Sequence, residues 1–419
     1  MSARPASPSG RADPALVLVL AGVSAALHVG KLPPALPVLG EVLGLSLLQS
    51  GFLLSMVQLA GVLLGLAVGL AADGVGLRRT LISGLLVLSV AGALGGWAQS
   101  APVLIALRGL EGLGFLLVAM PAPALLRRLV KAHRLSAVLG VWGSYMPLGM
   151  ALALLFGPLV LAQSGWQTWW WLTACLTGIM AVWVWHALPP DPEAGAAIHL
   201  AKGAVGAASK QHDGARARLG RTLRAPGPWL VALCFAVYSG QWLAVIGFLP
   251  SIYAQAHVSA ASGALLTALA ALVNISGNLA AGRLLQRGWP ASLLLQTGFC
   301  AMTLGAFGAF SGSSVMGAAA APTLLPFLSV LLFSAVGGMV PATLFSLAVR
   351  LAPDTQTVST TVGWMQQWSS LGQFVGPPLV AALAAAVGGW HWSWLLTGAC
   401  SVAGLLLAAL MGRLLQSRS

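Results

Sequence analysis

The chain has 419 residues, of which 58% are hydrophobic and 7% charged, and its mean hydropathy is +0.89. A water-soluble globule cannot bury this much apolar surface, so most of the chain must be solvated by lipid. The net charge of +13 does not indicate a nucleic-acid partner, because the basic residues lie in short gaps between apolar runs and not on one polar face.

The amino-terminal segment, residues 1–14, is polar and leads into the first apolar run without a small-residue cleavage site. We therefore expect a retained tail and not a cleaved signal peptide. Four cysteines lie inside apolar runs, and none forms a Cys-x-x-Cys pair: Cys175, Cys234, Cys300 and Cys400. Neither a disulfide framework nor a metal or other cofactor is predicted.

Apolar runs long enough to cross a bilayer follow one another along the chain. A hydrocarbon core of about 30 Å takes about 20 residues in a helix. Twelve runs meet this requirement, at residues 15–38, 47–72, 80–99, 102–126, 136–162, 167–188, 228–254, 261–282, 291–311, 322–349, 357–387 and 391–412. The fold class predicted from them is an all-α integral membrane protein with twelve transmembrane helices.

The basic residues test this count independently. Of the 21 Lys and Arg residues, 19 fall in the terminal segments or in every second loop, and the loops between carry none. Loops on the cytoplasmic side carry an excess of Lys and Arg. We therefore expect a plasma-membrane protein with both termini in the cytoplasm.

One long polar connection divides the runs into six and six. Two stretches at matching places, GPLVLAQSGWQTWWWLT (157–173) and GPPLVAALAAAVGGWHWSWLLT (376–397), share Gly-Pro, Gly-Trp and an aromatic-Leu-Thr approach to the next helix. A duplicated six-helix unit is the simplest explanation, with two bundles related by pseudo-two-fold symmetry. The predicted divisions are a tail 1–14, a bundle 15–188, a linker 189–227, a bundle 228–412 and a tail 413–419.

Several motifs give this chain a resemblance to the major facilitator superfamily. GLAADGVGLRR (69–79) resembles the family's loop signature after the second helix, and RGLEGLGF (108–115) its arginine motif. GVWGSYMPLGMALALLFGP (140–158) has the Gly and Pro content of the antiporter motif but not its order. HVGKLPPALP (28–37) and QQWSSLGQFVGPP (366–378) are similar to bacterial carriers of the cyanate and nitroimidazole type, and the chain is also loosely similar to drug–proton antiporters. The resemblance implies a monomeric transporter of the bacterial inner membrane.

The resemblance also implies roles for the loop signature. Two glycines would allow close backbone approach, an aspartate would cap a neighbouring helix or pair with a base, and two arginines would hold a cytoplasmic gate: Gly69, Gly76, Asp73, Arg78 and Arg79. The chain departs from the family pattern at Gly74, where a basic residue is usual.

Three charged residues lie inside predicted helices: Lys31, Arg108 and Glu111. One charge near a helix centre costs roughly 2.5 to 3.5 kcal/mol, so these residues are functional candidates. Arg108 and Glu111 share a helix face and can pair. Either the pair is purely structural, or Glu111 carries a proton and Arg108 is the fixed cation that tunes it. Replacing Arg108 by Ala is expected to leave Glu111 unpaired.

Lys31 lies one turn from His28 and just before Pro33 and Pro34, which we expect to distort the first helix. Lys31 either satisfies freed carbonyls, extends outward to water, or faces the substrate cavity as a second cation. Together with Lys31 and Arg108, the predicted cavity contains His28, Gln58, Trp142, Tyr145, Tyr238, Gln241, Trp242, Asn274, Gln366 and Gln367. Such polar groups also serve as ordinary contacts between helices.

The Trp-rich stretches 166–171 and 390–394 lie at helix ends, and we expect them to form an aromatic belt at the membrane surface.

No catalytic motif is present: the histidines form no H-E-x-x-H, and neither a phosphate loop nor a G-x-S-x-G sequence occurs. We predict a non-enzymatic, proton-coupled secondary carrier that moves a small organic solute by alternating access, with the solute, protons and lipid as partners. One alternative is a proton-independent facilitator or uptake carrier for a small anion, favoured by the excess of cations over acids in the helices. The other is a carrier-like receptor, which a long structured cytoplasmic domain would favour.

Overall fold

The computed structural model describes residues 13–131, 134, 138, 141–191, 215–311 and 324–416, without the side chains of 68–75 and 215. The regular structure in these residues is helical, as predicted. The helices are α1 (Pro14–Gly30), α2 (Leu32–Leu43), α3 (Leu47–Met56), α4 (Leu59–Val75), α5 (Leu77–Gly95), α6 (Ala101–Ala119), α7 (Ala122–Leu129), α9 (Tyr145–Ala187), α11 (Ala215–Arg224), α12 (Pro226–Gln255), α13 (Ala260–Leu272), α14 (Asn274–Gln286), α15 (Ala291–Phe310), α16 (Leu324–Gly337), α17 (Met339–Leu351), α18 (Val358–Val387), the 3₁₀ turn η1 (Trp390–Trp392) and α19 (Ser393–Gln416).

Eleven stretches of the described residues are long and apolar enough to cross a membrane. The longest, α9, contains a break at Gly165, where φ is 76° and ψ is 171°. Before the break, Gly157 lies against Pro34. After it, Thr177 contacts His28, so the chain returns along the first span. Because α9 is two antiparallel spans, the described residues contain the twelve predicted crossings.

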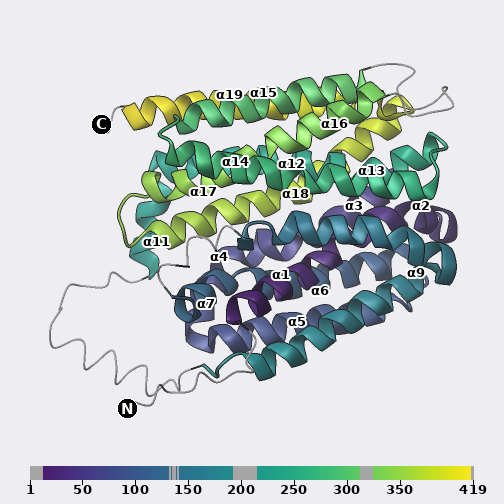
Figure 1. Cartoon of the computed structure of the whole chain (residues 1–419), viewed down its shortest axis with the longest axis horizontal. Coiled ribbons are helices and arrows are strands. Elements are labelled where there is room, and N and C mark those ends of the chain that lie inside the picture. The colour runs from purple at the N-terminus through teal and green to yellow at the C-terminus, as the bar shows by residue number, and fades with distance from the viewer. Residues whose placement is uncertain are drawn as a thin grey trace, which may run out of the picture.

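Breaks within spans repeat between the halves. In the first half the second span is divided into α3 and α4, and the fourth span into α6 and α7. In the second half the corresponding spans are divided into α13 and α14, and into α16 and α17. Figure 1 shows the two sets of helices as adjacent groups, coloured purple to teal and green to yellow. The shared break pattern supports the predicted pair of six-helix bundles.

The outer surface of the helices is apolar. Leu63, Ile179 and Leu304 are among the large hydrophobic side chains that are more than 60% exposed. In water these side chains would form an aggregation-prone surface, whereas lipid solvates them without cost. The exposed surface therefore agrees with a multi-pass membrane protein.

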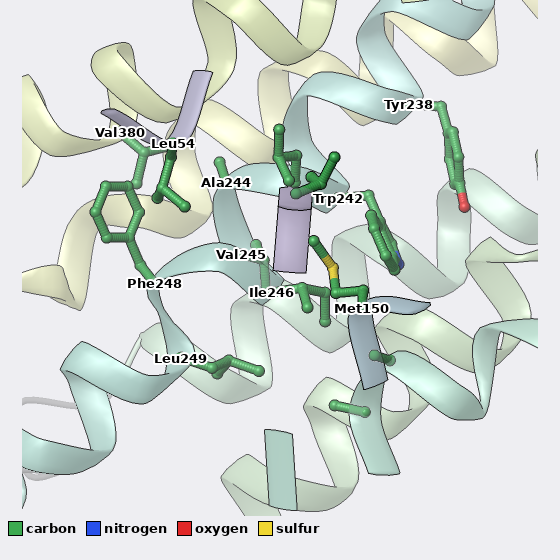
Figure 2. Packing of buried hydrophobic residues seen from close by; sticks show 14 of the residues in the cluster. Leu54, Met150, Tyr238, Trp242, Ala244, Val245, Ile246, Phe248, Leu249 and Val380 are labelled. Atoms are coloured by element: carbon green, nitrogen blue, oxygen red, sulfur yellow. The ribbon is translucent and has the colours of Figure 1, made fainter. Parts of the chain in front are cut away.

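The halves meet through the helix pairs α2 with α12, α3 with α18, α4 with α18, and α9 with α13. Figure 2 shows Leu54 of the first half close to Val380 and Phe248 of the second, and Met150 of the first half close to Ile246 of the second, in one shared hydrophobic cluster. At Gly247 the Leu54 side chain comes so close that a Cβ atom would lie 3.2 Å from it. In Figure 1, α7 and α11, which carry several arginines, lie on the left, and α2 and α13 lie on the right. We call the left end the basic side.

Candidate functional site

A network of four polar residues lies inside the first half. His28, Lys31 and Arg108 have no exposed surface, and Glu111 is 1% exposed. Arg108 Nη1 donates to Glu111 Oε2 at 2.5 Å, which confirms the predicted pairing. Lys31 Nζ donates to the other oxygen, Oε1, also at 2.5 Å. One carboxylate is therefore held between two cations.

The break between α1 and α2 positions Lys31 and frees backbone groups for this network. Pro33 and Pro34 have no N–H to continue the helix ladder, and α1 ends at Gly30. Arg108 Nη1 donates to the His28 carbonyl at 2.6 Å, and Trp169 Nε1 donates to the Lys31 carbonyl at 2.9 Å. The expected distortion of the first span is confirmed, and other helices supply the hydrogen bonds at the break.

Two expectations about these cations are wrong. Lys31 does not extend outward to water or satisfy freed carbonyls, because its ammonium is fully buried and contacts Glu111 and His28. Loss of Arg108 would not leave Glu111 unpaired, because Lys31 holds the other carboxylate oxygen. The sequence places Lys31 and Glu111 80 positions apart, and no local spacing rule connects them.

His28 is held from three sides. Its Nε2 lies 2.9 Å from Thr177 Oγ1 on α9, and its Nδ1 lies 3.3 Å from both Lys31 Nζ and Glu111 Oε1. On α5, a Cβ atom at Gly92 would lie 2.8 Å from His28 Cε1, so only glycine fits there without movement. Thr177 could not be predicted as a site residue, because a threonine in an apolar helix carries no distinctive sequence signal.

Part of the expected aromatic belt instead lines this network. Trp166, Trp169 and Trp170 are at most 3% exposed, so the belt interpretation is wrong for them. Lys31 Nζ lies 4.8 Å from the Trp170 ring centroid, within the range of a cation–π contact. Trp171, at 39% exposed, is on the outside. The helical spacing of 166, 169 and 170 was the available signal that these side chains share an inward face.

The network carries uncompensated positive charge. With His28 neutral, the charges of Lys31, Arg108 and Glu111 sum to about +1. Arg108 Nη2 is buried and has no hydrogen-bond partner among the described residues. A buried donor without a partner is costly, so this atom marks a place where a ligand could bind.

Other predicted cavity residues form a second network in the other half. Asn274 Nδ2 donates to Tyr238 Oη and to the Ser334 carbonyl, both at 3.0 Å. Trp242 Nε1 donates to Ser334 Oγ at 3.2 Å. Gln241 instead accepts a hydrogen bond from α19 at 3.0 Å. The structure thus brings Tyr238, Trp242 and Asn274 together, whereas Gln241 contacts a different helix.

Two of the predicted residues bridge the halves. Gln58 Nε2 donates to Gln373 Oε1 at 3.1 Å, and Gln367 Nε2 donates to the Val62 carbonyl at 2.6 Å. Gln366 is half-buried on α18. Contact of these side chains with a solute remains a prediction.

Trp142 and Tyr145 form a separate stack, with ring centroids 4.4 Å apart. Their rings pack against α1, where a Cβ atom at Gly22 would lie 2.6 Å from Trp142. Neither ring is among the hydrogen-bonded partners of the buried charges. Their place in a substrate cavity also remains a prediction.

The loop signature, residues 69–79, spans the end of α4 and the start of α5, and an acid outside it contacts the backbone of α5. Gly76 has a φ of 103° and precedes α5 without a side-chain cap. Asp191 accepts from the backbone N–H groups of Arg78, at 3.1 Å, and Arg79, at 3.0 Å. A carboxylate at a helix N-terminus satisfies free donors and complements the helix dipole. The missing cap at Gly76 was the one sequence signal that an acid from elsewhere could bind here.

Two further contacts stabilise the start of α5 and the position of Asp191. Arg128 Nη1 lies 3.7 Å from Asp191 Oδ1, and Arg78 Nη2 donates to the Trp185 carbonyl at 2.5 Å. The resemblance assigns gate roles to Gly69 and Asp73; Gly69 lies within α4, and the Asp73 side chain lies outside the described residues. The gate therefore remains a prediction, with Asp191 as an added member.

Comparisons with known proteins agree with one another. A family model described as Major Facilitator Superfamily matches residues 16–377. The chain is 24% identical over 271 residues to the cyanate transport protein CynX of Escherichia coli strain K12, which covers 63% of this chain and 64% of that protein. It is 30% identical over 189 residues to the uncharacterized transporter YgaY of Escherichia coli O157:H7, covering 43% and 46%. The matches thus span less than two thirds of the length of these curated relatives.

Solved structures show the same fold. A D-xylose–proton symporter superposes with a TM-score of 0.71 at 16% identity, covering 95% of this chain and 96% of that one. A bacterial homolog of the human lysosomal transporter Spinster, in an inward-facing and unoccupied conformation, gives a TM-score of 0.76 at 16% identity, covering 97% and 98%.

Proposed function

Because this chain belongs to the major facilitator superfamily, we propose that it is a proton-coupled secondary carrier that moves a small organic solute by alternating access. Its named relatives are transporters, and we assign the chain no enzymatic activity. The proposal places the basic side in the cytoplasm of a bacterium, with the protein in the inner membrane. The bundles 15–188 and 228–412 would rock about a central site while the linker 189–227 joins them.

The observation that carries this proposal is the fully buried carboxylate of Glu111 between Lys31 and Arg108. Buried ion pairs contribute little to stability when compared with apolar packing, and charges inside a membrane helix are costly, so the presence of this pair favours a functional role. Burial and neighbouring cations act on proton affinity in opposite directions. A change in hydration or partners during the transport cycle can therefore bind and release a proton here.

Flux through the purified protein tests the proposal. Proteoliposomes would be loaded at one pH and diluted into another, and uptake of radiolabelled cyanate, small organic acids and sugars would be followed with and without the pH gradient. Proton coupling predicts accumulation above the external concentration only when the gradient is present. Equal uptake of a transported solute with the gradient collapsed by a protonophore would contradict coupling.

The second candidate is a proton-independent carrier for a small anion. The excess positive charge at Lys31 and Arg108, and the unpartnered Arg108 Nη2, favour an anionic solute. The likeness to a protein named for cyanate transport points the same way. Anion uptake that is saturable but insensitive to an imposed pH gradient would establish this candidate over the first.

A further inference from the structure

Hydrogen bonding around His28 favours one tautomer of the neutral ring, with the proton on Nε2. Thr177 Oγ1 donates its single hydrogen to the Thr173 carbonyl at 2.9 Å. When Thr177 Oγ1 donates to this carbonyl it accepts from His28 Nε2, 2.9 Å away, and His28 Nδ1 accepts from Lys31 Nζ, so the Nε2–H tautomer satisfies all three contacts together. In a neutral imidazole the other nitrogen then has a free lone pair. His28 Nδ1 is thus a base inside the charged network.

The hydrogen-bond partners of His28 Nδ1 change when this nitrogen is protonated. The neutral ring accepts from Lys31 Nζ at 3.3 Å. A protonated Nδ1 must donate instead, and Glu111 Oε1 lies at the same distance of 3.3 Å. Lys31 Nζ then loses His28 Nδ1 as a hydrogen-bond acceptor. The imidazolium of His28 also competes with Lys31 for Glu111 Oε1. Protonation of His28 therefore weakens the ion pair between Glu111 and Lys31.

In the described part of the chain, three charged side chains contact His28. Lys31 approaches from the junction of α1 and α2, and Glu111 from α6. Arg108, also on α6, contacts the His28 carbonyl. Two further contacts of His28 among the described residues, with Thr177 on α9 and Gly92 on α5, are uncharged. The charge of the site is consequently set by these four titratable or charged side chains.

The charge balance links this proton to an anion. The network carries about +1 with neutral His28 and about +2 with protonated His28. Unpaired charge in a dry protein interior is costly. A bound monovalent anion restores the total to +1. Arg108 Nη2 is a buried donor without a partner in the described residues, and it belongs to the same network as the displaced Lys31.

We propose that one proton and one small monovalent anion bind to this network together. The proton comes from water and binds His28 Nδ1, while Nε2–H stays on Thr177. The imidazolium replaces Lys31 at Glu111 Oε1, and Lys31, still an ammonium, binds the anion together with Arg108 Nη2. Release reverses these steps. This inference rests on the proposed function, places the coupled proton on His28 with Glu111 as its ionised partner, and adds the substrate class and a one-to-one stoichiometry.

Binding measurements test the inference without requiring transport. Purified full-length protein in detergent would be titrated with formate and with nitrate between pH 6 and pH 8, and heat-induced unfolding would report binding. Sulfate and urea serve as divalent and neutral comparators. If one proton binds with each anion, the apparent Kd for formate and nitrate should decrease by up to about tenfold for each unit by which the pH is lowered. Sulfate and urea should have no comparable effect.

Matched variants assign the proton to His28. His28→Gln should remove the pH dependence of anion binding, whereas His186→Gln, at an exposed position on α9, should retain it. Should His28→Gln fail to fold, Thr177→Val provides the same test, because it removes the acceptor that favours this tautomer and should reduce the pH dependence. Thr173→Val makes the same chemical change one turn away, where the hydroxyl bonds only to its own helix.

Several results would overturn the inference: no binding of either monovalent anion, binding that does not change with pH, or unchanged pH dependence in His28→Gln and Thr177→Val. The proposed function fails separately. Gradient-driven accumulation of a neutral solute without anion binding would contradict the inference alone. Proton-linked anion binding without gradient-driven uptake of any solute would contradict the proposed function alone.

Discussion

At the scale of single residues, the buried charges of the first half do not balance. Glu111 is shared by Lys31 and Arg108, so each substitution leaves a different residual charge. Removing either cation leaves one neutral ion pair, while removing the acid leaves two cations side by side. The free-energy cost of a substitution should follow this residual charge and not the number of hydrogen bonds alone.

This charge balance predicts an order of stability. Lys31→Met should destabilise least, by about 1 kcal/mol or less, because the Arg108–Glu111 pair remains. Arg108→Met should cost more, because the His28 carbonyl also loses a donor. Glu111→Gln should cost most, about 3 to 5 kcal/mol, because two buried cations lose their acid. Midpoints of heat-induced unfolding in one detergent would give the order, with the exposed Arg283→Met as a control. An equal loss for Lys31→Met and Glu111→Gln would contradict the shared-carboxylate description.

The helix pair α12 and α18 depends on glycines at the contact. A Cβ atom at Gly372 would lie 2.7 Å from the carbonyl carbon of Ala236, and one at Gly376 would lie 2.7 Å from that of Gly240. Backbones can approach this closely only without side chains, which is how membrane helices obtain packing energy in lipid. The packing of this pair is thus set by the small size of these residues.

Gly372→Ala should therefore destabilise the protein by about 1 to 3 kcal/mol, as expected for overpacking. Gly398→Ala on α19 is the matched control, because no atom lies within 4 Å of the added Cβ. There the gain in helix propensity, up to about 1 kcal/mol, should raise stability. The two variants should shift the unfolding temperature in opposite directions, and a shift of the same sign and size would count against a packing role for Gly372.

The cap supplied to α5 by Asp191 gives a second prediction for an element. Asp191→Asn keeps the shape of the side chain but removes its charge, so the first turn of α5 should fray by a few tenths to about 1 kcal/mol. Hydrogen exchange at the amides of Arg78 and Arg79 should become faster. Asp354→Asn is the control, because that carboxylate accepts from Gln356 and Thr357 at the start of α18. Unchanged exchange at Arg78 and Arg79 would show that Asp191 does not stabilise this helix.

At the scale of the whole molecule, the proposed alternating access requires the halves to separate where they now touch. Gly51 packs against Ala381, with a would-be Cβ 3.1 Å from the Ala381 Cβ. In a variant that lacks the four native cysteines, a Gly51→Cys, Ala381→Cys pair should stop uptake when oxidised and restore it when reduced. A Gly30→Cys, Ala153→Cys pair, which lies within one half at a similar 2.9 Å, is the control. Uptake that persists with Gly51 and Ala381 linked would show that this contact does not open.

The sequence was sufficient to predict the helical class, the twelve crossings and the Arg108–Glu111 pair, because hydropathy, basic loops and i,i+3 spacing are local signals. It could not predict that Lys31 shares Glu111, that Thr177 orients His28, or that Asp191 caps α5. These contacts join residues 80 or more positions apart and depend on how helices pack. Trp169 and Trp170 were wrongly predicted to lie in an aromatic belt. That prediction used the Trp content of the stretch and its place at a helix end, and it did not use the helical spacing of these residues.

Coupling through the network around Glu111 is the central claim, and uphill uptake by Glu111→Gln tests it most directly. Proteoliposomes with an alkaline interior would receive radiolabelled cyanate, with protein-free liposomes to subtract diffusion of the neutral acid and counterflow exchange to show that the variant is folded. The wild type should accumulate cyanate above its external concentration, while Glu111→Gln should exchange it but reach only equilibrium. Accumulation by Glu111→Gln at the wild-type level would mean that the buried carboxylate does not couple transport to protons.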